Sequence, residues 1–325
     1  MRTLLLYTLI ILISLSCKKE NPSFPDTGRK IVVNCLLSTD SLIGVNICGS
    51  LYIKDTSNFV KYNFIDNAKV EIFENENYLD SLIYIDLRWS PSLTNSYLIP
   101  NNYRSKTFFP SPGKQYQIRI KAPKKPDAIA ITTIPNLVKI EKVDTTRIIL
   151  TNVDYWQSKI KFACNIFFTD PAGEKNYYLF YVFNKDVLWS GTYIMDEGVT
   201  FLDPITEENL NSGSYTFGIA FSDKSINGKQ HRISVTLDGK DIGFPMGDSS
   251  SLCLFCKETK ESVVYFRLYS ITEDYFRYIQ TLNMFFKNYK NPLAEPVQVY
   301  SNITGGYGIF AGAAVSSDSI VFHLH

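Results

Sequence analysis

Apolar and polar residues alternate with a period of two along much of the chain. Between residues 115 and 121, Tyr116, Ile118 and Ile120 alternate with polar neighbours. Successive side chains of a strand point to opposite faces, so this pattern predicts a strand with one face on a core and the other in water. Because clusters of Pro, Gly, Asn and Asp separate such segments, we expect stacked antiparallel sheets. The same alternation recurs at residues 68–72, 159–166, 233–237 and 264–268.

One segment has the spacing of a helix instead. Apolar residues between 271 and 287 recur every three or four positions, which predicts an amphipathic helix packed on a sheet. Ser270 and Glu273 are spaced as a capping box at its start, and Pro292 follows its end. A helix that binds a partner or the membrane surface is the alternative interpretation. The apolar stripe consists of Tyr275, Ile279, Leu282 and Phe286, widened by Tyr278 and Phe285.

The aromatic content supports a sheet-rich fold. The 325 residues include 21 Tyr and 22 Phe, and these side chains favour the pleated, half-buried surface of a sheet. The length fits two domains of ordinary size, and the threonines and proline at residues 131–135 suggest where the first domain ends. The expected fold class is therefore mainly β. Tandem antiparallel β-sandwich-like domains would occupy residues 30–136 and 137–325, with the helix packed in the second.

The N-terminal segment has the parts of a secretory signal. A basic Arg2, an apolar run of about a dozen residues and the small Ser16 precede Cys17. The run is too short to span a bilayer, which takes about 20 residues. We expect residues 1–16 to be removed as a bacterial lipoprotein signal peptide, with Cys17 as the acylated first residue; an ordinary secretory signal with an incidental cysteine is the alternative. Residues 17–29 then form a flexible tether.

The charge balance gives no electrostatic case for nucleic acid as a partner. The net charge is +1, whereas a nucleic-acid backbone is bound by a concentrated basic surface. The densest basic cluster is Lys121 with Lys124 and Lys125, and prolines interrupt it. We interpret this cluster as a solvated linker.

Five cysteines remain beyond Cys17, an odd number that leaves at least one of them unpaired within the chain. Cys253 and Cys256 have the spacing of a redox motif. They lie in an expected loop and not at a helix start, so a local structural disulfide or two reduced thiols is the preferred interpretation. Cys35 and Cys48, near the two ends of an expected hairpin, are a second disulfide candidate. No second ligand pair at zinc spacing is evident, so no metal site is expected.

Catalytic motifs are scarce, and we expect neither an enzyme nor a cofactor. The three histidines are His231, His323 and His325, and no Gly-x-Ser-x-Gly nucleophile elbow is present. The glycine-rich residues 305–308 are expected to form a turn with a bulge, between a strand at 297–300 and an apolar run. A phosphate-binding loop would need a helix to follow it.

Several short segments occur in a characteristic order after Cys17. They are residues 30–34, 66–72, 112–118, 133–135, 221–223, 226–228, 275–278, 291–292, 301–303 and 306–310. In order and spacing, these segments resemble the domain-of-unknown-function 4249 family of Bacteroidota outer-membrane lipoproteins. The resemblance implies an outer-membrane lipoprotein, commonly encoded beside a TonB-dependent outer-membrane transporter, with no established catalytic activity.

The expected function is that of a non-enzymatic outer-membrane lipoprotein that acts as an accessory or ligand-capture partner of a TonB-dependent transporter. A structural or adhesive cell-surface module without a small-molecule ligand is the alternative. The candidate ligand or partner surface comprises Trp89, Tyr97, Trp189 and Tyr193, although such aromatic rings also serve as lids over a core. The lipid anchor would hold the chain at the outer membrane, on either the periplasmic or the cell-surface face.

Overall fold

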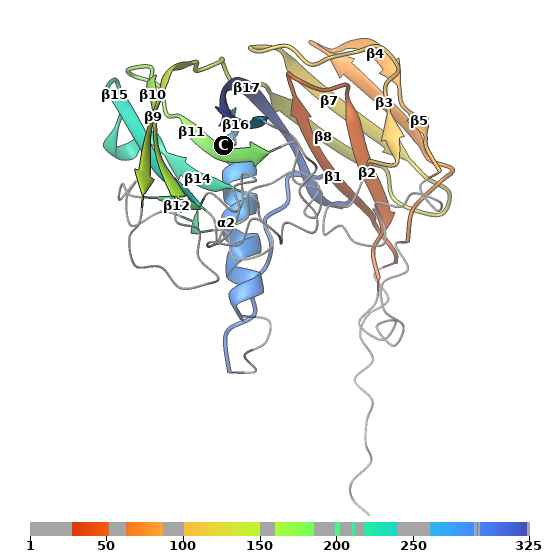
Figure 1. Ribbon diagram of the computed structural model, residues 1–325. Helices are drawn as coiled ribbons and strands as arrows, with labels where there is room; N and C mark the ends of the chain where they lie inside the picture. The colour runs from red at the N-terminus through yellow and green to blue at the C-terminus, as the bar shows by residue number, and fades with distance from the viewer. Residues whose placement is uncertain are drawn as a thin grey trace, which may run out of the picture.

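The computed structural model describes most of the chain between residues 28 and 323 (Figure 1). The described residues are 28–51, 63–86, 101–149, 160–184, 199–201, 210–211, 218–238, 261–288, 291 and 293–323. Their strands are β1 (Ile31–Ser38), β2 (Gly44–Gly49), β3 (Lys69–Glu74), β4 (Asn77–Ser81), β5 (Ile83–Tyr84), β6 (Tyr103–Arg104), β7 (Gln115–Lys121), β8 (Ala128–Thr133), β9 (Ile140–Ile149), β10 (Ile160–Thr169), β11 (Tyr177–Asn184), β12 (Val199–Phe201), β13 (Leu210–Asn211), β14 (Ile219–Ser222), β15 (Gln230–Asp238), β16 (Glu261–Ile271) and β17 (Tyr307–His323). The helical elements are the 3₁₀ turn η3 (Asp223–Ser225) and the helix α2 (Glu273–Asn288).

A nine-stranded sheet lies at the centre of the fold. Its strand order is β13-β14-β11-β16-β17-β1-β2-β6-β5, and β17, the last strand in sequence, lies near its middle. The other described strands form two four-stranded sheets, β12-β15-β10-β9 and β4-β3-β7-β8. The segments that alternate in the sequence form β3, β7, β10, β15 and β16. The expected mainly β fold of stacked sheets with a packed helix is confirmed.

Both four-stranded sheets pack on the same face of the nine-stranded sheet, side by side (Figure 1). Phe310 and Phe322 of β17 are an even number of residues apart, so their side chains point to the same face. Phe310 packs against β3, β7 and β8 in a first core, and Phe322 packs against β10 and β15 in a second core. The two β-sandwich cores therefore share one sheet. Their largest fully buried side chains are Tyr103, Tyr116 and Phe310 in the first core, and Phe168, Tyr178, Phe180, Phe221 and Phe266 in the second.

The predicted domains, residues 30–136 and 137–325, follow one another along the chain, but the last strand, β17, contributes to both cores. Ile134 belongs to the first core and Val138 to the second, so the chain crosses between the cores at this point. Ile303 and Phe310, however, pack in the first core. β17 serves both cores because its 17 residues pair with β1 at one end and with β16 at the other.

β1 and β17 pair in parallel, whereas the alternating pattern predicts antiparallel sheets. Val33 pairs with Gly308, and a Cβ added to Gly308 would overlap the carbonyl oxygen of Val33. Gly308 also has a φ of 105°, which side chains other than glycine rarely adopt. The glycines therefore allow close approach of two backbones. The predicted strand at residues 297–300 is wrong, because these residues belong to no strand and regular pairing starts at Tyr307.

α2 covers the face of the nine-stranded sheet that is turned away from the two sandwich cores. Phe276 and Ile279 of the helix pack with Leu179, Ile271 and Ala313. These three residues alternate along their strands with residues of the sandwich cores, so they point to the opposite face. The wide apolar stripe of the helix is thus part of a third, smaller core, as the packed-helix interpretation predicts.

The helix begins two residues later than the predicted start at residue 271. Thr272 and not Ser270 caps it, because the N–H of Tyr275 donates to Thr272 Oγ1 at 3.4 Å. Ser270 still belongs to β16, whose pairing with β17 continues through Ile271, and its hydroxyl accepts from the N–H of Val138. Within the described ranges, no helix has the length and apolar character needed to cross a membrane.

A buried polar corner closes the second core where β10, β11 and η3 meet. The hydroxyl of Tyr178 donates to Asp170, whose other carboxylate oxygen accepts from the N–H of Gly228 at 3.0 Å. Asp223 accepts from the N–H of Asn176 at 2.8 Å. Burial, followed by the bond to Asp170, raises the pKa of Tyr178 far above its ordinary value. Donors in the surrounding turns therefore satisfy two buried carboxyl groups.

We predict that Tyr178→Phe lowers the free energy of unfolding by about 1.5–3 kcal/mol, because it removes a buried hydrogen bond to a carboxyl group and leaves Asp170 with one donor fewer. Urea denaturation measures the change. Tyr78→Phe is the matched control, since the hydroxyl of Tyr78 bonds to Ser81 at the exposed surface and its loss should change stability by no more than about 0.5 kcal/mol. Equal losses in the two variants would contradict a stabilising role for the corner.

We predict that Gly308→Ala destabilises the protein by about 2–5 kcal/mol, because backbone strain and overlap with Val33 act together. Gly173→Ala separates the two effects. Gly173 has a φ of 83°, but an added Cβ would meet no atom within 4 Å, so strain alone should cost about 1–2 kcal/mol. Thermal unfolding followed by circular dichroism compares the variants. A loss at Gly308 no larger than the loss at Gly173 would show that the β1/β17 contact tolerates a side chain.

Candidate functional site

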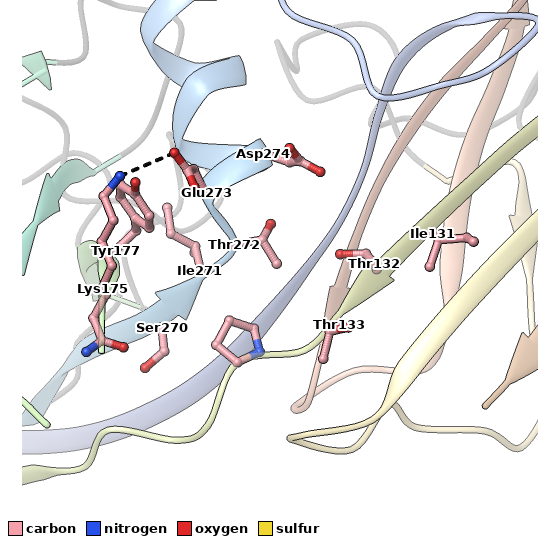
Figure 2. A pocket seen from close by; sticks show the side chains of 12 residues that line it. Ile131, Thr132, Thr133, Lys175, Tyr177, Ser270, Ile271, Thr272, Glu273 and Asp274 are labelled. Carbon is pink, nitrogen blue, oxygen red and sulfur yellow. Dashed lines mark hydrogen bonds and ion pairs between the residues drawn. The ribbon is translucent and has the colours of Figure 1, made fainter. Parts of the chain in front are cut away.

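An open groove lies where the two sandwich cores meet. It is lined by residues 131–133, 135, 175–177 and 270–274, and its volume is about 390 Å³, within the range of roughly 300–1,000 Å³ that is typical of ligand pockets. Figure 2 shows Lys175, Tyr177 and Glu273 on one side of the groove and the side chains of β8 on the other. The end of β16 and the start of α2 therefore face the end of β8.

The groove forms beside the point at which the chain crosses between the cores. Ile134 passes directly over Gly312 of β17, where an added Cβ would lie 2.9 Å from the Cα of Ile134. Farther along, the N–H of Val138 donates to Ser270 Oγ at 3.3 Å. The N–H of Thr272 donates to the carbonyl oxygen of Gly312 at 3.2 Å. These contacts fix the position of β8 relative to the first turn of α2.

One wall of the groove carries an ion cluster at the first turn of α2. Glu273 accepts from Arg277 Nη2 at 2.8 Å and lies 3.4 Å from Lys175 Nζ. Lys175 Nζ also lies 5.2 Å from the centre of the Tyr177 ring. Hydrogen bonding to Tyr177 is the main cause that lowers the pKa of Glu273, burial opposes it, and Lys175 and Arg277 reinforce it. A carboxylate at this end of a helix is also favoured by the helix dipole.

The next residue, Asp274, is held by the segment that leads into β17. Asp274 Oδ1 accepts from the hydroxyl of Tyr300 at 2.5 Å, and Oδ2 accepts from Asn302 Nδ2 at 3.0 Å. Burial, together with this bond to Asp274, raises the pKa of Tyr300 to about 12. Asn302 in turn exchanges two hydrogen bonds with the backbone of Phe310. Both acidic side chains in the first turn of α2 are therefore engaged within the chain.

The opposite wall of the groove is the outer edge of β8. This strand is the last in its sheet and has β7 on its inner side. Ile129 exchanges both of its backbone hydrogen bonds with Thr304 across the outer edge. Because the backbone groups of alternate residues point to the same edge of a strand, those of Ile131 and Thr133 point outward as well. No described residue donates to them or accepts from them.

The predicted site residues lie mostly outside the described ranges, and for these the predictions stay predictions. They are the acylation candidate Cys17, the cysteine pair Cys253 and Cys256, and the aromatic residues Trp89, Tyr97, Trp189 and Tyr193. His325 is also outside the described ranges.

The predicted disulfide between Cys35 and Cys48 is wrong, because both side chains are free thiols. Cys48 pairs with Val32 in the β1/β2 ladder, so its side chain lies on the same face as that of Val32. Cys35, three residues farther along β1, points to the opposite face. Burial raises the pKa of Cys48 to about 11 and raises that of Cys35 well above its ordinary value. Neither is an activated thiol.

Each histidine within the described ranges contacts a neighbouring side chain. The His231 ring packs against Phe168 with ring centres 5.7 Å apart, and His323 Nδ1 lies 3.3 Å from Glu261. In the part of the chain that the structure describes, no three His, Cys, Asp or Glu side chains come close enough to hold a metal ion.

The sequence does not predict the groove. Lys175 and Glu273 are 98 positions apart, and they meet because β11 pairs with β16. The signals that the sequence does carry are local. Glu273 occurs at the start of a helical pattern, and Pro135 follows the last residues of β8, where proline is tolerated because no interior strand pairing continues.

Comparison with known proteins places the chain in a family. The model of the domain of unknown function DUF4249 matches residues 19–319. The chain belongs to the DUF4249 family. Membership of the DUF4249 family, which the sequence pattern predicts, is thereby confirmed. No curated protein sequence matches this DUF4249 member.

A solved structure with some likeness to this DUF4249 member is the full-length major pilin SpaD from Corynebacterium diphtheriae. The sequences are 10% identical, the match covers 91% of this chain and 66% of the pilin, and the TM-score is 0.21. The chain thus spans about two thirds of the length of the pilin. A TM-score this low supports no argument about fold or function.

We predict that the contribution of Glu273 to stability is lost on acidification. Because the pKa of Glu273 is lowered in the folded state, the contribution is present above the unfolded-state pKa of about 4.3 and disappears as the pH falls through the folded-state pKa. Urea unfolding of the wild type and of Glu273→Gln should therefore differ most near neutral pH and converge in acid. Glu76→Gln controls for the change in net charge. A difference that persists undiminished near pH 3 would contradict the prediction.

Proposed function

We propose that this DUF4249 protein is a non-enzymatic outer-membrane lipoprotein that acts as an accessory partner of a TonB-dependent transporter. We further propose that it binds an extended segment of that partner in the groove. The lipid would be attached at Cys17, whose sequence context has the parts of a lipoprotein signal. The observation that carries the binding proposal is the part of the outer edge of β8 at Ile131 and Thr133, where no described residue bonds to the outward backbone groups inside the groove.

The groove offers main-chain groups at the spacing of a strand. Lys175, Glu273 and Asp274 already have partners within the chain. The outward N–H and C=O groups of Ile131 and Thr133 have none among the described residues. An extended peptide satisfies such groups in order, by adding a strand to the sheet edge. The groups that are left to bind therefore favour a polypeptide segment over a small polar ligand.

The chain itself already uses part of this edge. Thr304 exchanges two hydrogen bonds with Ile129, at 2.9 and 3.0 Å. An added segment would continue this ladder toward Thr133. The side chain of Ile131, which is 50% exposed, and the ion cluster on the opposite wall would contact the side chains of the segment. In strand addition the main chain supplies affinity and such side-chain contacts supply specificity.

Recovery of the partner from outer membranes tests the proposal. The full-length lipidated protein is extracted in mild detergent and purified, and copurifying proteins are identified by mass spectrometry. We predict recovery of a TonB-dependent transporter in roughly equimolar amount. Its absence would overturn the partnership and favour the structural or adhesive alternative. The intact mass of the mature protein shows separately whether Cys17 is acylated.

Substitutions at the edge of β8 test the groove in the same experiment. Ile131→Pro removes an outward N–H and leaves the hydrogen bonds to β7 in place, and edge positions tolerate proline. We predict that it lowers recovery of the transporter roughly tenfold. Ile131→Val keeps the N–H and a branched side chain, so recovery should match the wild type. Circular dichroism checks that both variants fold. Equal recovery with Ile131→Pro would show that the partner binds elsewhere.

A further inference from the structure

We infer that the C-terminal end of α2 rests on the surface of the lipid bilayer that holds the acyl chains of Cys17. The inference depends on the lipid anchor of the proposed function. It adds a second membrane contact, which would give the groove a fixed orientation. Three observations carry it: the direction of α2, the exposed apolar side chains at its end, and the position of Gly28, the first described residue after Cys17.

The contacts of α2 determine the direction in which it points. At its start, the N–H of Thr272 donates to Gly312 of β17. Farther along the helix, the hydroxyl of Tyr278 donates to Asn34 of β1 at 3.3 Å. Asn34 pairs with Ile309, which is nearer to the start of β17 than Gly312 is. The contacts of α2 therefore move toward the start of β17 along the helix. Because β1 is parallel to β17, α2 runs antiparallel to β1 and toward the end at which β1 begins.

The described chain therefore begins, at Gly28 and then β1, on the side of the molecule to which α2 points. Figure 1 shows the end of α2 at the lower side, projecting beyond the sheets. Cys17 precedes Gly28, the first described residue, by eleven positions. An extended chain spans about 3.3–3.6 Å per residue, so Cys17 lies within roughly 40 Å of Gly28. A bilayer that holds Cys17 can lie directly below the end of α2.

The end of α2 exposes large apolar side chains. Leu293, just beyond the helix, is 93% exposed, and Met284 and Phe285 in its last turns are 52% and 39% exposed. In the first half of the same helix, Phe276 and Ile279 are buried against the sheet. Exposed apolar side chains gathered at one end of an element are typical of a contact surface.

The composition of this end favours lipid over a protein partner. Lys287 and Glu295 are exposed there and have opposite charges. Because these charges offset each other, the apolar side chains would supply the contact. Such side chains insert at the boundary between headgroups and acyl chains without a complementary protein surface. The helix has 16 residues and is about 24 Å long. Contact at its C-terminal end would therefore hold the groove, at its N-terminal end, about that far above the bilayer.

Fluorescence quenching by brominated lipids tests the contact. Full-length acylated Phe285→Trp protein is reconstituted into vesicles of phosphatidylethanolamine and phosphatidylglycerol, with and without bromine on the acyl chains. The wild-type signal is subtracted to remove the native tryptophans. For a side chain at the headgroup boundary, we predict at least about a twofold loss of the added emission.

Phe109→Trp is the matched control. Phe109 is 55% exposed, and its neighbour Phe108 bonds to Ile43, next to the start of β2 and therefore at the far end of β1. Its emission should be unchanged. Vesicle flotation reports the anchor separately from the contact.

Quenching at position 285 but not at position 109 supports the inference. Protein that floats without quenching at position 285 overturns the contact and leaves the lipid anchor standing, whereas protein that does not float overturns both. A change in emission at position 285 that appears only after outer-membrane extract is added would assign the end of α2 to a protein partner instead.

Discussion

The N-terminal part of β17 pairs in parallel with β1, and its C-terminal part pairs with β16. Because β17 joins these two strands, the two sandwich cores share one sheet. The approach is possible because Gly308 has no side chain where the two backbones meet. Gly312 plays a comparable part where the chain crosses from one core to the other. The surface that α2 covers, with Leu179 of β11 and Ala313 of β17, is continuous only because these strands belong to the same sheet.

The groove and α2 follow from the same arrangement. The end of β8 and the start of α2 come from opposite sides of the crossing at residues 134–138, and contacts to Gly312 and Ser270 hold them apart. α2 then spans the distance between the groove and the side of the molecule at which β1 begins. One helix therefore relates a candidate docking edge to a candidate membrane contact.

Local patterns in the sequence predict the elements well. The alternation around Ile118 identifies β7, and the apolar stripe around Ile279 identifies α2, because each pattern reflects which face is buried. The choice between Ser270 and Thr272 as the helix cap is not local, since both carry a hydroxyl and the pairing of β16 with β17 decides it.

Contacts between distant segments account for what the sequence does not reveal. Cys35 and Cys48 look like the ends of a hairpin, but their pairing register places them on opposite faces. Gly308 indicates that two backbones approach each other closely, but the sequence does not show that Val33 is the neighbour. The groove requires the register of β11 on β16 and the position of β8 as the last strand of its sheet, and neither leaves a periodic pattern. Such features depend on which strands become neighbours, a property of the whole chain.

The central position of β1 has a mechanical consequence. A pull on the chain that precedes β1 acts along the axis of the strand, while its hydrogen bonds to β17 and β2 run across that axis. The load is then shared by both ladders in shear, so the bonds must fail together and not one after another. A strand at the margin of the sheet, held on one side, would peel away more easily. Burial in the middle of the largest sheet makes β1 a firm point of attachment for whatever holds the N-terminus.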